Sequence, residues 1–115
     1  MPTCTIRSNV SFDHINGEAF MKAVSELVAT TVGKDEAYVQ VSLQPTPHMT
    51  FGGNTLPTAH VDIASIGFPG GTPAELAPPF FAFFEDHLGV TPERLYLSFT
   101  DLQRDHVAWN GKTFG

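Results

Sequence analysis

Pro2, which follows Met1, is the residue of this sequence that could carry the most unusual chemistry. Cells normally remove an initiator methionine that precedes a small proline, and the removal would expose a secondary amine on a rigid ring. A free N-terminal amine has a pKa of about 8. A group with such a pKa can take up a proton and return it near neutral pH. On its own, however, a proline at position 2 is an ordinary terminal residue, so any chemistry depends on its surroundings.

Lys34 is the cation that best suits such an amine. Burial in an apolar pocket and a nearby positive charge both lower the pKa of an amine, and Phe and Trp side chains of this chain could build the pocket. Lys34 also follows Gly33 at the expected end of a helix, where a cation interacts favourably with the helix dipole. The two roles are compatible.

The other reactive side chains fit no further site. Cys4 is the sole cysteine, which excludes an intrachain disulfide, and we expect it to be a small buried residue rather than a nucleophile. The pairs Gly52-Gly53 and Gly70-Gly71 lack a phosphate-loop pattern and indicate turns. No metal site is expected, because the histidines show no ligand spacing. They are His14, His48, His60, His87 and His106.

The composition is that of a single globular domain spanning residues 1–115. Hydrophobic residues make up 42% of the chain and charged residues 16%. The net charge of −6 argues against nucleic acid as a partner, because phosphate binding needs a basic face. No apolar run is long enough to span a membrane, and the first residues lack a signal-peptide pattern. We therefore expect a cytoplasmic protein, or one secreted without a signal peptide.

The elements that must position these groups follow from the spacing of apolar residues. β-Branched or alternating residues predict strands over residues 2–7 and 39–44. Between them, apolar residues at helical spacing predict a helix that Asp13 or Asn16 caps and that ends at Gly33.

The second half of the chain repeats this order. Alternation predicts strands over residues 60–65 and 95–99. Between them, residues 72–75 form a capping box that starts a helix, and Gly89 ends it. Because a proline removes a helical donor and clashes with the preceding turn, we expect this helix to kink at Pro78-Pro79 or to restart there.

An internal duplication of a β-α-β unit accounts for this order, since the pattern at residues 38–43 recurs at 94–99. Prolines and glycines predict a loop over residues 45–57, and Asn110-Gly111 predicts a C-terminal hairpin. Two tandem β-α-β units predict an α+β two-layer sandwich, a four-stranded mixed sheet with two helices on one face. The uncovered face would need partners, so we expect a symmetric oligomer.

Several short motifs stand in a defined order along the chain after Pro2. They are Asn9-Val10, Gly33-Lys34, Tyr38-Val39, Phe51-Gly52-Gly53, Ser65-Ile66-Gly67, Pro92-Glu93-Arg94-Leu95-Tyr96, and Trp109-Asn110-Gly111 with Thr113-Phe114. Each is weak alone, but together they resemble the macrophage migration inhibitory factor family from end to end. The resemblance implies a homotrimer whose three sheets form a barrel. It also implies a keto–enol tautomerase, without a cofactor, for phenylpyruvate, hydroxyphenylpyruvate or dopachrome derivatives.

The resemblance also implies roles for individual residues. Pro2 resembles the catalytic base, while Lys34 and the backbone N–H of Ile66 resemble the groups that hold the substrate's anionic oxygens. Tyr96 resembles an aromatic wall contributed by the neighbouring subunit, and Ser98 stands where the family's best-known member has an asparagine at the distal end of the substrate. The implied apolar lining is Tyr38, Val107, Trp109 and Phe114.

Three departures from the family pattern bear on activity. Ser98 would shorten or remove the contact to the distal end of the substrate, and Thr100 replaces an aromatic residue nearby. Thr58 and Val61 occupy the positions of a Cys-x-x-Cys pair. Thiol oxidoreductase activity is therefore not expected, and the choice of substrate is open.

Two other functions remain alternatives. The first is a cytokine-like, secreted signalling or binding protein with weak or vestigial tautomerase activity, which would require a receptor. The second is dehalogenation or decarboxylation, as in other enzymes that use an N-terminal proline. Such enzymes usually need extra Arg and carboxylate partners, and the few arginines here, Arg7, Arg94 and Arg104, make this alternative less attractive.

Overall fold

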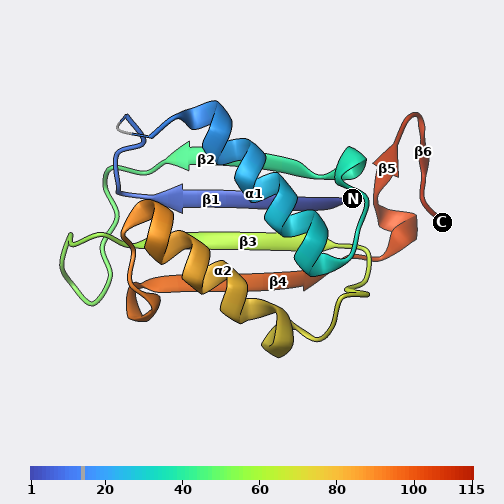
Figure 1. Cartoon of the computed structure of the whole chain (residues 1–115). Helices are drawn as coiled ribbons and strands as arrows, with labels where there is room; N and C mark the ends of the chain where they lie inside the picture. Colours follow the sequence, from blue (N-terminus) through green and yellow to red (C-terminus); the bar gives the residue numbers. More distant parts are fainter. Residues whose placement is uncertain (14) are drawn as a thin grey trace.

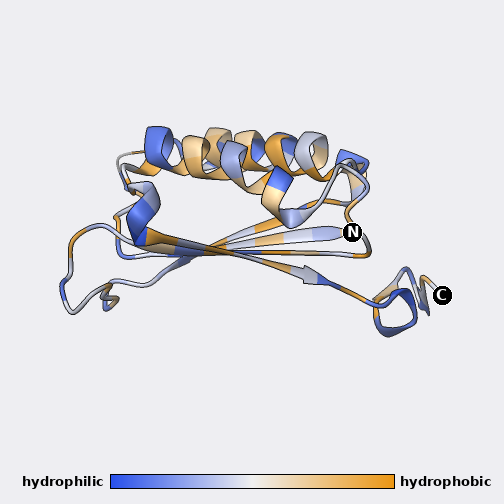
Figure 2. Cartoon of the chain, turned by 90° about the horizontal axis from the view of Figure 1, so that it is seen from below, coloured by the Kyte–Doolittle hydropathy of each residue, from blue (hydrophilic) through white to orange (hydrophobic). Residues whose placement is uncertain are grey.

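The computed structural model describes residues 1–13 and 15–115, so His14 of the histidine set lies outside the described residues. Its core is a four-stranded mixed sheet with the strand order β2-β1-β3-β4 (Figure 1). The strands are β1 (Pro2–Ser8), β2 (Gln40–Pro45), β3 (Ala59–Ser65) and β4 (Leu95–Asp101). Two helices, α1 (Gly17–Val32) and α2 (Pro73–Leu88), lie side by side on one face of this sheet (Figure 2).

The two halves of the chain form the two predicted β-α-β units. β1 pairs with β2 in parallel and β3 with β4 in parallel, while β1 and β3 pair antiparallel at the centre of the sheet. The predicted α+β two-layer sandwich with tandem units is confirmed.

Alternation along the central strands separates the two faces of the sheet. One set of side chains is buried beneath the helices, and the other set faces away from them on a surface that we call the open face. The buried set is Pro2, Cys4, Ile6 and Ser8 of β1 and Ala59, Val61, Ile63 and Ser65 of β3. The open face carries mainly polar residues, among them Thr3, Thr5 and Arg7 of β1 and His60 and Asp62 of β3.

The cap of α1 is Asn16 rather than the alternative, Asp13. The Asn16 side chain accepts a hydrogen bond from the Ala19 N–H at 3.1 Å. At the other end, Gly33 closes the helix with a φ of 81°, a left-handed conformation that costs glycine little because it has no Cβ. This turn places Lys34 at the start of the connection to β2.

Of the two outcomes predicted for the second helix, a kink at Pro78-Pro79 or a restart there, the restart is wrong, because α2 is continuous from Pro73 to Leu88. Pro78 and Pro79 cannot donate hydrogen bonds to the carbonyls of Ala74 and Glu75. All four residues are exposed, so water can satisfy those carbonyls. The buried residues of α2 keep an uninterrupted spacing of four across the proline pair. They are Leu76, Phe80, Phe84 and Leu88. Burial of this stripe against the sheet outweighs the cost of the prolines.

The N-terminus lies at the same end of the sheet as the C-terminal segment (Figure 1). That segment contains a short 3-10 turn, η3 (Arg104–His106), followed by the predicted hairpin of β5 (Ala108–Trp109) and β6 (Lys112–Thr113). A second 3-10 turn, η1 (Glu36–Tyr38), precedes β2 at this end. The long loop between β2 and β3 lies at the opposite end of the sheet.

Candidate functional site

Two cavities lie around Met1, where the N-terminus, η1 and the C-terminal segment meet. The first cavity has a volume of about 400 Å³, and the second a volume of about 280 Å³. Met1, Tyr38 and Phe114 line both of them. The first is further lined by Thr3, Ala37, Val39, Gln40, Val107, Ala108 and Trp109, and the second by Lys34, Asp35, Ile66 and Arg104.

Most of the residues implied by the family resemblance therefore gather at this end of the sheet. Lys34 and Ile66 line the second cavity, Val107 and Trp109 line the first, and Tyr38 and Phe114 line both. Pro2 is the first residue of β1, where it pairs with Ser65 of β3 directly beside Met1. These residues come from four separate parts of the chain, and the sheet topology brings them together.

The aromatic residues of the first cavity hold one another in place. The rings of Tyr38 and Trp109 meet edge to face, with their centroids 5.2 Å apart, and Trp109 stacks on Phe114 at 6.4 Å. Such pairs stabilise an arrangement beyond the area that they bury. They connect η1 to the C-terminal segment and form an apolar wall on one side of Met1.

The second cavity contains the electrostatic part of the site. The Lys34 Nζ donates a hydrogen bond to the Ile66 carbonyl at 2.7 Å, so this ammonium is fixed beside the end of β3. Burial, and next the charge of Lys34, lower the pKa of the N-terminal amine of Met1 from its ordinary value. An amine at this end of the sheet is therefore more easily deprotonated than one in water.

Tyr96 and Ser98 do not line either cavity of the same chain. Both belong to β4 and lie on the open face, where Tyr96 pairs with His60 and Ser98 with Asp62. The Tyr96 ring packs against Phe51, with the centroids 5.2 Å apart, yet it is still 63% exposed. Within a single chain the structure does not bring these two residues to the N-terminus.

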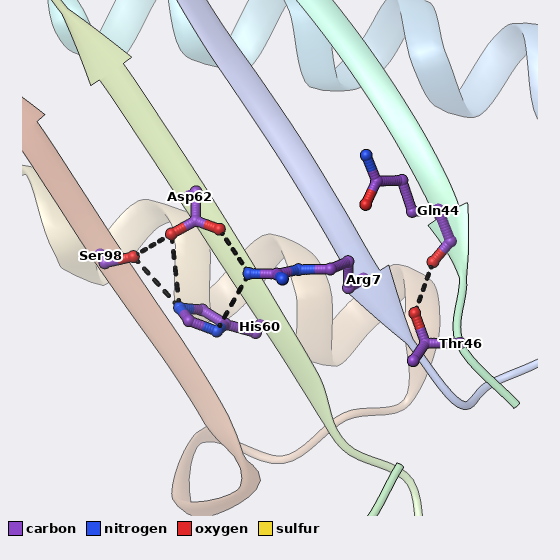
Figure 3. Close-up of polar contacts among 6 residues, drawn as sticks. All are labelled: Arg7, Gln44, Thr46, His60, Asp62 and Ser98. Carbon is purple, nitrogen blue, oxygen red and sulfur yellow. Dashed lines mark hydrogen bonds and ion pairs between the residues drawn. The ribbon is translucent and has the colours of Figure 1, made fainter. Parts of the chain in front are cut away.

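Ser98 instead belongs to a cluster on the open face, which we call the open-face cluster: Arg7, His60, Asp62 and Ser98 (Figure 3). The Ser98 hydroxyl donates to Asp62 Oδ1, and Arg7 Nη2 donates to Asp62 Oδ2 at 2.8 Å. His60 Nε2 lies 3.1 Å from Ser98 Oγ. Beside the cluster, the Thr46 hydroxyl donates to the Gln44 carbonyl at 3.0 Å.

The open-face cluster has the composition of a serine–histidine–aspartate site but not its geometry. In a nucleophilic site the serine donates to the histidine, which removes its proton; here the Ser98 hydroxyl donates to the carboxylate. Burial raises the pKa of Asp62, but the hydrogen bond from Ser98 and the charges of His60 and Arg7 outweigh it, so the net pKa is lowered. The cluster is thus a paired set of charges that stabilises the fold.

Arg104 is a second cation of the cavity lining, beside Lys34, and neither its spacing nor the family resemblance predicts it. Its Nε and Nη2 donate to the Phe114 carbonyl at 3.3 and 3.2 Å. Its side chain lines the second cavity, and among residues 1–13 and 15–115 it forms no ion pair. Nothing in the local sequence marks this arginine, because it lies in a turn and reaches the N-terminus only through the course of the C-terminal segment.

Other kinds of site find little support in the described part of the chain. Cys4 is fully buried, and burial, with a smaller contribution from Asp62, raises the pKa of its thiol to about 12, so it is no nucleophile. Among residues 1–13 and 15–115, no group of three His, Cys, Asp or Glu side chains is placed to hold a metal ion. No helix in the same ranges is long and apolar enough to cross a membrane.

Fold and site together define a small α+β protein with a cavity built around its own N-terminus. The family model described as macrophage migration inhibitory factor matches residues 1–115. The chain is 34% identical to a macrophage migration inhibitory factor homolog of Trichuris trichiura, over 99% of this chain and 100% of that protein. It is 30% identical to the macrophage migration inhibitory factor of Rattus norvegicus, over 99% of each.

A solved structure gives the same result. The crystal structure of a macrophage migration inhibitory factor homologue from Prochlorococcus marinus superimposes with a TM-score of 0.88 and 34% identity, covering 98% of this chain and 99% of that chain. This chain belongs to the macrophage migration inhibitory factor family. The family predicted from the sequence is therefore confirmed.

Proposed function

We propose that the protein is a keto–enol tautomerase of small aromatic α-keto acids such as phenylpyruvate, with the nitrogen of Pro2 as its catalytic base. The observation that carries the proposal is the position of Met1 between the two cavities, beside Lys34. Removal of Met1 would free the Pro2 nitrogen and leave it open to both cavities, with the aromatic wall on one side and the cation on the other.

The reaction needs one group that removes a proton and returns it elsewhere. The neutral Pro2 amine takes a proton from C3 of the keto acid, the electron pair of the C–H bond forms the double bond between C2 and C3, and the π pair of the carbonyl moves to the keto oxygen. The Lys34 ammonium stabilises the resulting enolate oxygen, which then receives the proton from the protonated Pro2 amine. No atom is gained or lost, so the reaction is an isomerisation and can run in either direction.

The environment of the N-terminus supports this role. Burial and Lys34 lower the pKa of the Met1 amine, and both act on the same end of the sheet where the Pro2 amine would lie. A lowered pKa keeps a larger fraction of the amine neutral at pH 7, which the base requires. The Pro2 ring is fully buried at the start of β1, so the direction of its nitrogen is fixed.

A homotrimer would account for Tyr96 and Ser98, which lie away from the cavities of their own chain. We propose that the open face and the exposed Tyr96 of one subunit approach the N-terminal cavity of the next, as the family resemblance implies. Tyr96 would then stack on the substrate ring. The Ser98 hydroxyl is already donated to Asp62, so its contribution to the substrate would be small.

The proposal is tested by the rate of phenylpyruvate ketonisation in the wild type and in Pro2→Gly, each shown by mass spectrometry to lack Met1. We expect a slower rate in Pro2→Gly, because glycine lacks the ring that directs the amine. Equal rates in the two proteins would refute the role of Pro2. If neither protein converts any keto acid, the binding or signalling alternative is favoured instead.

A further inference from the structure

The second cavity contains two cations, and only one of them has a role in the proposed reaction. We infer that Arg104 binds the carboxylate of the substrate and thereby restricts the enzyme to α-keto acids with a free carboxylate. This inference rests on the proposed function, because it concerns the same cavity. It adds a residue that determines which carbonyl compounds can enter.

The donors of Arg104 are only partly used within the protein. A guanidinium has five N–H donors and no acceptor. Nε and Nη2 of Arg104 donate to the Phe114 carbonyl, and in the described part of the chain Arg104 forms no ion pair. The N–H groups of Nη1 have no protein acceptor among these contacts. They are available to an anion in the cavity that Arg104 lines.

The two cations differ in a way that suits the two oxygen-bearing groups of an α-keto acid. The compact ammonium of Lys34, fixed on the Ile66 carbonyl, suits the single enolate oxygen. The remaining edge of the planar Arg104 guanidinium, formed by Nη1 and the second N–H of Nη2, matches the two oxygens of a carboxylate. With both cations in place, Lys34 need not hold the carboxylate as well.

Asp35, the acidic residue that lines the second cavity, does not neutralise the positive charge of Arg104. Its carboxylate accepts a hydrogen bond from the Ala37 N–H at 3.0 Å and caps η1. The carboxylate is thus held by the backbone of η1, and it forms no ion pair with Arg104 in the described ranges. The cavity keeps two positive charges against one negative charge, which favours an anionic ligand.

The experiment measures equilibrium binding, so it does not depend on turnover. The probes are benzoylformate, an α-keto acid without an enolisable hydrogen, and its methyl ester, in which a methyl group replaces the negative charge. Binding is measured by isothermal titration calorimetry to the full chain without Met1, as wild type and as Arg104→Gln. We expect the wild type to bind the acid, and Arg104→Gln to weaken this binding at least about tenfold. Binding of the ester should change less than about twofold.

Two further variants separate a carboxylate contact from other effects. Lys112→Gln removes the same charge from the C-terminal segment but not from a cavity, and it should leave the binding of the acid unchanged. Arg104→Lys restores the charge without the planar fork, and it should recover part of the affinity.

Three results would overturn the inference. The wild type could fail to bind benzoylformate, or Arg104→Gln could bind it as well as the wild type does. Equal weakening for acid and ester would show that Arg104 acts only by holding the Phe114 carbonyl. Since benzoylformate cannot tautomerise, a protein that binds it through Arg104 but does not convert phenylpyruvate would refute the proposed function alone.

Discussion

The N-terminal cavities and the open-face cluster contain similar side chains but use them differently. In the cluster, Arg7 and Asp62 form an ion pair at 2.8 Å, and Ser98 donates to the same carboxylate. In the cavities, the acceptors of Lys34 and Arg104 in the described part of the chain are backbone carbonyls. A neutral carbonyl fixes the position of a cation but leaves its charge uncompensated.

Residue type alone therefore does not identify a site. The cluster contains the serine, histidine and aspartate of a familiar catalytic group, yet its carboxylate is paired with Arg7 Nη2 and Ser98, and among the buried side-chain polar atoms of the described residues only Arg7 Nε lacks a hydrogen-bond partner. The cavities contain no familiar catalytic group, yet they combine an amine with a lowered pKa, two uncompensated cations and an aromatic wall. Changes in the cavities should therefore alter activity, while changes in the cluster should alter stability.

Blocking the Pro2 nitrogen should have the largest effect. An alanine placed between Met1 and Pro2 becomes the N-terminal residue once Met1 is removed, and it converts the Pro2 nitrogen into an amide without basicity. General acid–base catalysis contributes about 10²- to 10⁴-fold, so we expect kcat for phenylpyruvate to fall by that order. The same alanine placed after Gly115 is the matched control. Full activity of the blocked protein would contradict the account.

Removal of the Lys34 charge should have the next largest effect. In Lys34→Met the enolate loses its ammonium, and we expect kcat to fall on the order of 10²-fold. The pKa of the N-terminal amine should also rise, because the charge that helps to lower it is gone. The rise of kcat/KM with pH should therefore move to higher pH. Lys22→Met, which changes an exposed lysine paired with Glu18, should leave both quantities unchanged.

Asp62→Asn in the open-face cluster should change stability and leave turnover of phenylpyruvate within about twofold. The variant removes the ion pair with Arg7, which is partly exposed and therefore screened by solvent. We expect the free energy of unfolding at pH 7 to fall by roughly 1 kcal/mol, measured by urea denaturation. A loss of activity without a loss of stability would show that the cluster belongs to the active site.

The effect of Asp62→Asn should also depend on pH. The pKa of Asp62 is lower in the folded protein than in the unfolded chain, so the ionised carboxylate stabilises the fold above its ordinary pKa of about 3.9. That contribution is lost as the pH falls through the folded value. The difference in unfolding free energy between wild type and variant should thus be present at pH 6 and diminish below about pH 4.

The smallest effect is expected for the exposed pair of Glu18 and Lys22 on α1. Its atoms are 3.2 Å apart, and both side chains are largely in water. Pairs of this kind contribute about 0.2–0.5 kcal/mol. Glu18→Gln should therefore change the free energy of unfolding by less than Asp62→Asn does, in the same urea experiment. A larger change would show that exposed ion pairs contribute as much to the free energy of unfolding as the open-face cluster does.

Most of the fold could be predicted from the sequence because it depends on local periodicity. The alternation of β1 and β3, the helical spacing of α1 and the Asn110-Gly111 turn each indicate their element directly. The continuity of α2 could not be predicted from local rules. It follows from the burial of Phe80 and Phe84 against the sheet, which outweighs the local cost of the prolines.

The candidate site was only partly predictable, for a related reason. Pro2 and Lys34 stand in motifs, so the family resemblance identifies them. Arg104 stands in no motif, and its place in the cavity depends on the path of the chain after β4. The pairing of Ser98 with Asp62 depends on the register of β3 and β4, which periodicity does not fix.

The proposed chemistry requires that the Pro2 nitrogen is a free amine whose pKa is lowered by its surroundings. A ¹⁵N NMR titration of the protein labelled at proline, after mass spectrometry has established the loss of Met1, tests this requirement most directly. We predict a Pro2 nitrogen that titrates below the ordinary pKa of about 8, and at higher pH in Lys34→Met. A Pro2 nitrogen that shows no titration, or that titrates at the ordinary value in both proteins, would contradict the account.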